Sequence, residues 1–194
     1  MGWRKIAIAL VLQALLAGAA WADEPSSGDD ALPASGFSIQ GDSGLTQDEA
    51  DRLYDAQGHL HRRLTLLVAF VDARLSKMHD LCAEAPSATD AQKIRSLLEQ
   101  IGSLIARADD DLDQDQGQVF DSTKLPGMRA GLKEVIAAFG RYGHALEPVD
   151  AAAASAAWKS YAPVFQGTLQ SVEDTLRSSL GVAQAYLQND QQVD

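Results

Sequence analysis

The sequence predicts an all-α protein, folded as an up-down-up-down four-helix bundle. After residue 45, apolar residues recur at alternating steps of three and four, which places them on one face of an α-helix. No stretch alternates apolar and polar residues as a half-buried strand does. Four such stretches joined by short or moderate connections are typical of a bundle.

The first predicted helix begins at a capping box and ends before Pro86. Thr46 and Glu49 have the spacing at which each side chain accepts a hydrogen bond from the other residue's backbone amide. Gln57 fills the one polar position of the apolar seam. The seam consists of Ala50, Leu53, Leu60, Leu64, Leu67, Val71, Leu75, Met78 and Cys82. We therefore expect one continuous helix of about 40 residues, or ~60 Å.

The two middle helices are predicted to be shorter and to form a hairpin. The second opens near residues 87–89 and stops at Gly117. The third begins at Pro126, which suits a first helical position, and stops at Pro148. Four glycines in the third helix indicate close backbone approach or local mobility, because each lowers helix stability by ~1 kcal/mol relative to alanine. They are Gly127, Gly131, Gly140 and Gly143.

The fourth predicted helix is as long as the first and is capped by Asp150. Pro163 lies inside its apolar stripe, so a kink or break is expected near Ala162. Three aromatic residues surround this proline and are interpreted as core, with a pocket opened by the kink as the alternative: Trp158, Tyr161 and Phe165. The bundle thus has two long outer helices and a shorter central hairpin. Its core is predicted to contain Leu64, Leu67, Ile101 and Leu176.

Residues 1–22 are expected to be a cleavable secretory signal peptide. Arg4 and Lys5 precede an apolar run over 6–16, and Ala20-Trp21-Ala22 presents small residues where a signal peptidase cuts. The apolar run is shorter than the ~20 residues that span a bilayer. We therefore expect a periplasmic or secreted protein with no membrane anchor after cleavage; the alternative is an uncleaved N-terminal anchor.

Two further segments follow the signal peptide. Residues 23–44 are rich in Gly, Ser, Pro and Asp and are expected to form a disordered leader. Residues 45–190 are expected to form a single helical domain. Cys82 is the one cysteine, so no intrachain disulfide can form. We expect this thiol to be buried, and the alternative is an intermolecular disulfide in a homodimer.

The chain is strongly acidic. Its formal net charge of −11 becomes −13 when the signal peptide is removed, because that segment carries two positive and no negative side chains. Such a charge repels nucleic acid and anionic lipid at long range, and we expect neither as a partner. It favours basic partners and cations, although solubility alone also explains it.

An aspartate-rich run is the candidate metal site. Asp111, Asp113 and Asp115 have the one-three-five spacing of oxygen ligands in a calcium loop, and Asp121 could complete the set. The glycine expected at the sixth position is displaced to the seventh, so the loop is irregular. The alternative is a solvated acidic helix end. We also expect the basic stretch 59–63 to lie opposite this run and to pair with it electrostatically.

The remaining polar motifs predict no catalytic or transition-metal site. Asp55 with His59, and His144 with Glu147, each offer two ligands on one helix face, and two ligands do not make a site. There is no Cys-x-x-Cys-His motif for covalent haem, and no nucleophile, zinc-protease or phosphate-loop motif. We therefore expect no enzyme. The sequence favours an exported acidic helical-bundle protein that binds a protein partner, as a chaperone, inhibitor, immunity protein or envelope adaptor does. The alternative is a calcium-binding protein that uses the 109–121 loop.

Overall fold

The computed structural model describes residues 44–116 and 125–191, all within one compact unit that spans Phe37–Asp194. These residues form five α-helices and one short 3₁₀ helix, with no strand in the described ranges. The prediction of an all-α protein is therefore confirmed for them. The helices are α1 (Gln47–Asp55), α2 (Leu60–Ala83), α3 (Ala88–Gln116), α4 (Leu125–Ala154), η1 (Ala162–Val164) and α5 (Gln166–Gln191).

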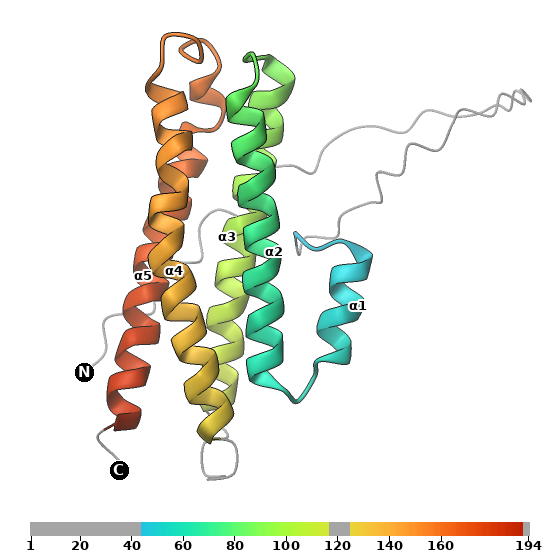
Figure 1. The fold of residues 1–194 in the computed structure, drawn as a ribbon, viewed down its shortest axis with the longest axis vertical. Helices are drawn as coiled ribbons and strands as arrows, with labels where there is room; N and C mark the ends of the chain where they lie inside the picture. Colours follow the sequence, from blue (N-terminus) through green and yellow to red (C-terminus); the bar gives the residue numbers. More distant parts are fainter. Residues whose placement is uncertain (1–43, 117–124, 192–194) are drawn as a thin grey trace, which may run out of the picture. The chain divides into compact units, whose positions relative to one another are not determined.

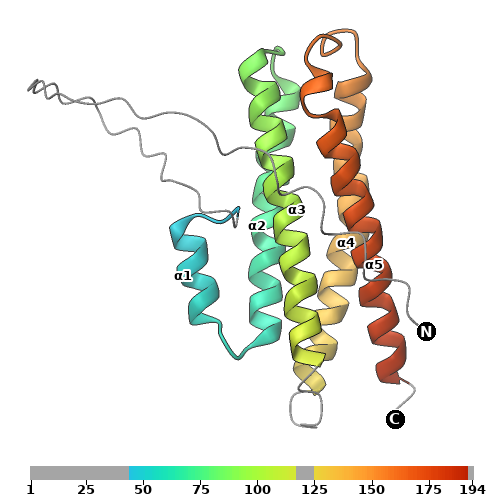
Figure 2. The same cartoon turned by 180° about the vertical axis from the view of Figure 1, so that it is seen from behind.

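The four long helices pack side by side around a common core (Figures 1 and 2). Helix α2 contacts α3 and α4, and α5 contacts the same two helices from the other side. Helix α1 contacts only α2 among the described helices and lies at the edge of the group. The long helices contain 24, 29, 30 and 26 residues, so the predicted contrast between long outer helices and a short central hairpin is wrong.

The first error of prediction is at Gly58. The expected single helix breaks at residues 56–59, and α1 turns back against α2. Gly58 has a φ of +78°, a left-handed conformation that glycine adopts without the Cβ clash of other residues. The apolar seam continues through the break, so its periodicity did not reveal the turn.

The second error is at Pro148. This proline does not stop α4, which runs on to Ala154, so Asp150 lies inside α4 instead of capping the next helix. Proline removes the hydrogen bond to the carbonyl four residues earlier, at His144. Both residues are exposed, so water can reach that carbonyl. Four alanines over 151–154 have the highest helix propensity and favour continuation. The chain is broken at the predicted place, since η1 begins at Ala162, but the break is wider than predicted: α4 ends at Ala154 and α5 begins only at Gln166, so residues 155–165 connect two helices and are not part of one long helix.

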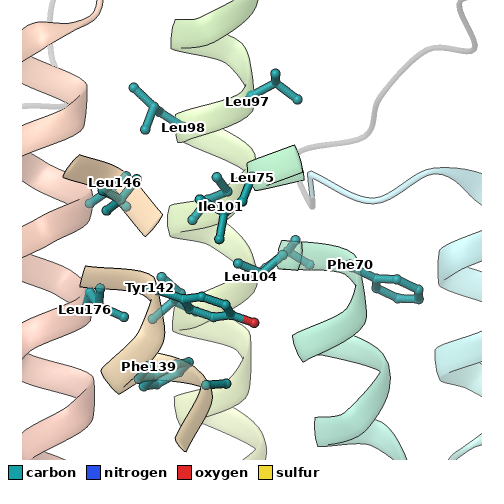
Figure 3. Packing of buried hydrophobic residues seen from close by; sticks show 14 of the residues in the cluster. Phe70, Leu75, Leu97, Leu98, Ile101, Leu104, Phe139, Tyr142, Leu146 and Leu176 are labelled. Carbon is teal, nitrogen blue, oxygen red and sulfur yellow. The ribbon is translucent and has the colours of Figure 1, made fainter. Parts of the chain in front are cut away.

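The predicted core is confirmed. Leu64, Leu67, Ile101 and Leu176 are all buried, and side chains from all four long helices meet between them (Figure 3). The aromatic residues around Pro163 form the expected cluster, with Trp158 edge-on to both Tyr161 and Phe165. Cys82 is half-buried, and burial raises the pKa of its thiol.

One of the predicted glycines marks a close helix contact. A Cβ at Gly131 on α4 would lie 2.8 Å from Cδ1 of Leu64 on α2. Gly140 and Gly143 have nothing within 4 Å of a Cβ, so they are not sites of close approach. The predicted role of glycine in bringing backbones together thus holds at Gly131.

The predicted signal peptide (1–22) and leader (23–44) lie outside the described residues, apart from Gly44. In the described ranges, no helix combines the length and the apolar character needed to cross a bilayer.

Candidate binding site on the α1 arm

Helix α1 is fixed at its start by the capping box that the sequence predicts. Backbone N–H of Glu49 donates to Thr46 Oγ1 at 3.3 Å, and backbone N–H of Thr46 donates to Glu49 Oε2 at 2.9 Å. Gly44 precedes the cap with a φ of +64°, and a Cβ there would lie 3.2 Å from the Cα of Gln100. The chain therefore passes close against α3 before α1 begins.

A buried arginine holds helix α1, which we call the arm, onto the bundle. The Arg74 side chain, 7% exposed, donates from Nη1 and Nη2 to the two carboxylate oxygens of Glu49, both at 2.7 Å. Nη2 also donates to Gly44 O, Nη1 to Phe70 O, and Nε to Gln100 Oε1. All five N–H donors of the guanidinium therefore have an acceptor. We call this arrangement around Arg74 and Glu49 the latch.

The latch also sets the charge of Glu49. Burial raises the pKa of Glu49, but hydrogen bonds from Arg74 and Thr46 and the positive charge of Arg74 outweigh burial and leave the pKa below its ordinary value. Glu49 thus serves both as the capping-box carboxylate and as the partner of Arg74. Because one side chain carries both roles, the fold of α1 and its attachment to α2 are coupled.

The underside of the arm is apolar. Leu45, Leu53 and Ala56 are buried, and Leu45 and Leu53 join the same apolar cluster as the side chains of the long helices. Figure 3 shows Phe70 turned toward α1, while the other labelled side chains gather between the long helices. The guanidinium of Arg52 lies 5.2 Å above the Phe70 ring, a cation–π distance. Phe70 is 3% exposed in this arrangement.

The outer face of α1 is acidic and carries an exposed aromatic residue. Gln47, Asp51, Tyr54 and Asp55 are exposed and share one face by their spacing of three and four. Nε2 of Gln47 donates to Asp51 Oδ1 at 2.8 Å. Tyr54 is 69% exposed, the larger of the two values for exposed large hydrophobic side chains in the described residues.

The predicted calcium ligands are dispersed where they are described. On α3, Asp111 accepts hydrogen bonds from Arg63 Nε at 2.9 Å and Nη2 at 2.5 Å, which confirms the predicted pairing of the basic stretch with the acidic run. Asp113 accepts a hydrogen bond from the Tyr186 hydroxyl on α5, so the two aspartates engage different helices. The Asp115 side chain and the whole of Asp121 lie outside the described residues. The complete site stays a prediction, which a calcium titration of the purified protein tests.

Asp109 is the third acidic residue with defined partners. Its Oδ2 accepts a hydrogen bond from Ser179 on α5, and its buried Oδ1 has no hydrogen-bond partner among the described residues. Burial raises the pKa of Asp109, with the charges of Asp113 and Asp110 acting in the same direction and the Ser179 hydrogen bond opposing it.

The histidines do not converge. His59 precedes α2 while Asp55 ends α1, so the predicted shared helix face is wrong for this pair. His144 contacts Glu147 at 2.8 Å on an exposed surface, as their spacing predicts. His61 contacts Glu134, and His79 contacts the Ala145 carbonyl oxygen. Within residues 44–116 and 125–191, no three His, Cys, Asp or Glu side chains are grouped so as to hold a metal ion.

Sequence reasoning missed Arg74 and Tyr54. A signal for Arg74 was present: Phe70 is a large apolar residue outside the α2 seam, and Arg74 lies one turn further on the same side. An apolar residue on a second face of a helix indicates that another element covers that face. Tyr54 lies outside the predicted seam, so its exposure could be read from the sequence, but the separate arm that carries it could not.

No protein-family model, no curated protein and no solved structure matches this chain.

Proposed function

We propose that this chain is an exported, acidic helical protein that binds a protein partner, and that the outer face of α1 makes the contact. Export rests on the expected signal peptide. In this proposal the four long helices form an up-down-up-down scaffold, and its role is binding and not catalysis. The latch supports the proposal because it holds a short helix in a defined orientation, which lowers the entropy lost on binding.

The exposure of Tyr54 carries the proposal. Tyrosine is enriched among the few interface residues that carry most of the binding energy, since its ring gives a large apolar area and its hydroxyl a hydrogen bond. Tyr54 is 69% exposed on a helix whose other face is buried against α2. A single exposed tyrosine is ordinary; one placed on an arm with a dedicated polar anchor is the better candidate for a contact residue.

The acidic neighbours of Tyr54 indicate the chemistry of the partner. Asp48, Asp51 and Asp55 are exposed on α1, and the whole chain carries a formal charge of −11. Complementary charges accelerate encounter and select among partners. We propose a partner with a basic surface that receives the Tyr54 ring. Chaperones, inhibitors, immunity proteins and envelope adaptors remain the proposed types of activity.

The test has two stages. The mature protein is used to capture partners from an envelope extract, and a captured protein is then purified and its affinity measured. We expect Tyr54→Ala to weaken binding at least tenfold, about 1.4 kcal/mol, because the complex loses the ring that the partner would bury. Affinity should also fall as sodium chloride is raised, since rim charges are screened.

Val182→Ala is the matched control, because Val182 is an exposed hydrophobic residue on α5, 37% exposed. It should leave the affinity unchanged. An equal loss in both variants, or an affinity that Tyr54→Ala does not alter, would show that the partner binds elsewhere.

A further inference from the structure

We propose that α1 is exchanged between two copies of this chain. In the exchanged dimer, residues 56–59 straighten, α1 and α2 become one helix, and the α1 of each copy takes the place of the other's on α2. The surface that receives it is the outer side of α2 with the latch residue Arg74 and the ring of Phe70. This inference does not depend on the external partner proposed above.

The seam provides the first argument. Ala50, Leu53, Gln57, Leu60 and Leu64 keep the alternating three-and-four spacing across the break. Gly58 in the hinge has a left-handed backbone, and nothing lies within 4 Å of where its Cβ would be. The sequence from 47 to 83 is thus compatible with one continuous helix. A continuous helix carries α1 away from its own α2 and uncovers Phe70.

The pairing of the two helices provides the second argument. The midpoints of the contacts Glu49–Arg74 and Arg52–Phe70 both fall near residue 61. Two straightened helices related by a two-fold axis near residue 61 therefore place Glu49 of one copy opposite Arg74 of the other. The contacts made within one chain are remade between chains, and the dimer is closed and isologous.

The limited attachment of α1 provides the third argument. Among the described helices it contacts α2 alone, and its main polar anchor is the bidentate ion pair of the latch. Most of the buried core cluster comes from α2, α3, α4 and α5, and the α1 segment adds Leu45 and Leu53 to it. The same contacts form within one chain in the monomer and between chains in the exchanged dimer. The equilibrium between monomer and dimer is therefore set by the conformation of the hinge and by the protein concentration.

The experiment measures dimerisation of the full mature chain by analytical ultracentrifugation. Gly58→Ala penalises the left-handed hinge and favours helix, so we expect the straightened hinge to be favoured roughly tenfold in each chain. Because the dimer contains two hinges, its dissociation constant should fall about a hundredfold. Gly58→Asn is the matched control, because asparagine tolerates positive φ, and it should resemble the wild type. Gly140→Ala, an exposed helix position open to a Cβ, controls for general helix propensity and should also resemble the wild type.

A charge exchange shows whether the dimer uses the latch. In the Gly58→Ala background, one chain carries Glu49→Lys and a second carries Arg74→Glu. Each variant alone should remain monomeric, because residues 49 and 74 then carry charges of the same sign. An equimolar mixture should form heterodimers, because residue 49 of each chain then faces a residue 74 of opposite charge in the other chain. The proposal is overturned if Gly58→Ala stays monomeric with an opened arm, or if it dimerises and the mixture forms no heterodimer.

Discussion

Leu64→Ala is expected to lower the free energy of unfolding by about 2–5 kcal/mol, in the upper half of that range. Leu64 is fully buried, with 0% of its surface exposed, at the contact between α2 and α4. Truncation removes its apolar contacts and leaves a cavity that Gly131 is too small to fill. Chemical denaturation of the variant and the wild type measures the loss.

Gly131→Ala makes this prediction specific to the helix contact. In the wild type its Cβ would lie 2.8 Å from Leu64 Cδ1, so we expect no gain in stability. In the Leu64→Ala background the same methyl group fills space and adds helix propensity, so we expect a gain of about 1 kcal/mol. Additive effects of the two substitutions would contradict the close approach of α2 and α4.

Arg63→Met is expected to lower the free energy of unfolding by about 3 kcal/mol, because it leaves the carboxylate of Asp111 buried without its cation. The Asp111 side chain is 6% exposed and that of Arg63 19% exposed. Replacing both residues by methionine should recover most of the loss, since no unpaired charge then remains.

The control for Arg63 is the same substitution at an exposed ion pair. Arg95 contacts Glu99 one turn away, with both side chains about half exposed. Arg95→Met should cost no more than about 0.5 kcal/mol. If Arg63→Met is as mild as Arg95→Met, the Arg63–Asp111 pair does not hold α2 against α3 as the structure indicates.

The parts of the fold that the sequence predicted are those that depend on local periodicity. The seam positions face the core because a three-and-four spacing fixes one face of a helix whatever its neighbours are. The capping box at Thr46 and Glu49 formed because both partners lie within one turn. A break around Pro163 was expected from the missing amide of proline, although the connection that contains it already begins after Ala154.

The errors lie at positions where the local sequence signal was weak and the surrounding structure decided the conformation. Gly58 allows a helix to continue or to turn back, and the turn is stabilised by distant contacts to Phe70 and Arg74. Pro148 was tolerated because the carbonyl it leaves without an amide partner is at the surface and the following alanines favour helix. Helix lengths depended on these two positions, so the predicted inequality of the helices was wrong.

The candidate site was predicted less well than the fold. The aspartate run was predicted to bind a metal because of its composition and spacing. Its described members Asp111 and Asp113 form hydrogen bonds that join α3 to neighbouring helices. The latch joins residues 25 positions apart, Glu49 and Arg74, and no local spacing reveals such a pair. Tyr54 is off the predicted seam, but its place on a separate short helix became clear only when the turn at Gly58 was known.

The separate attachment of α1 is the central claim, since both the proposed function and the proposed exchange need an arm held by the latch. Residue-resolved native-state hydrogen exchange of the monomer tests it most directly. We expect the α1 amides to open at a free energy at least ~2 kcal/mol below that of the α2–α5 core, as for a locally opening unit. Glu49→Gln, which weakens the ion pair with Arg74, should lower protection further in α1 and leave the core amides unchanged. Exchange of α1 amides at the free energy of global unfolding, with Glu49→Gln lowering all five helices equally, would contradict the account.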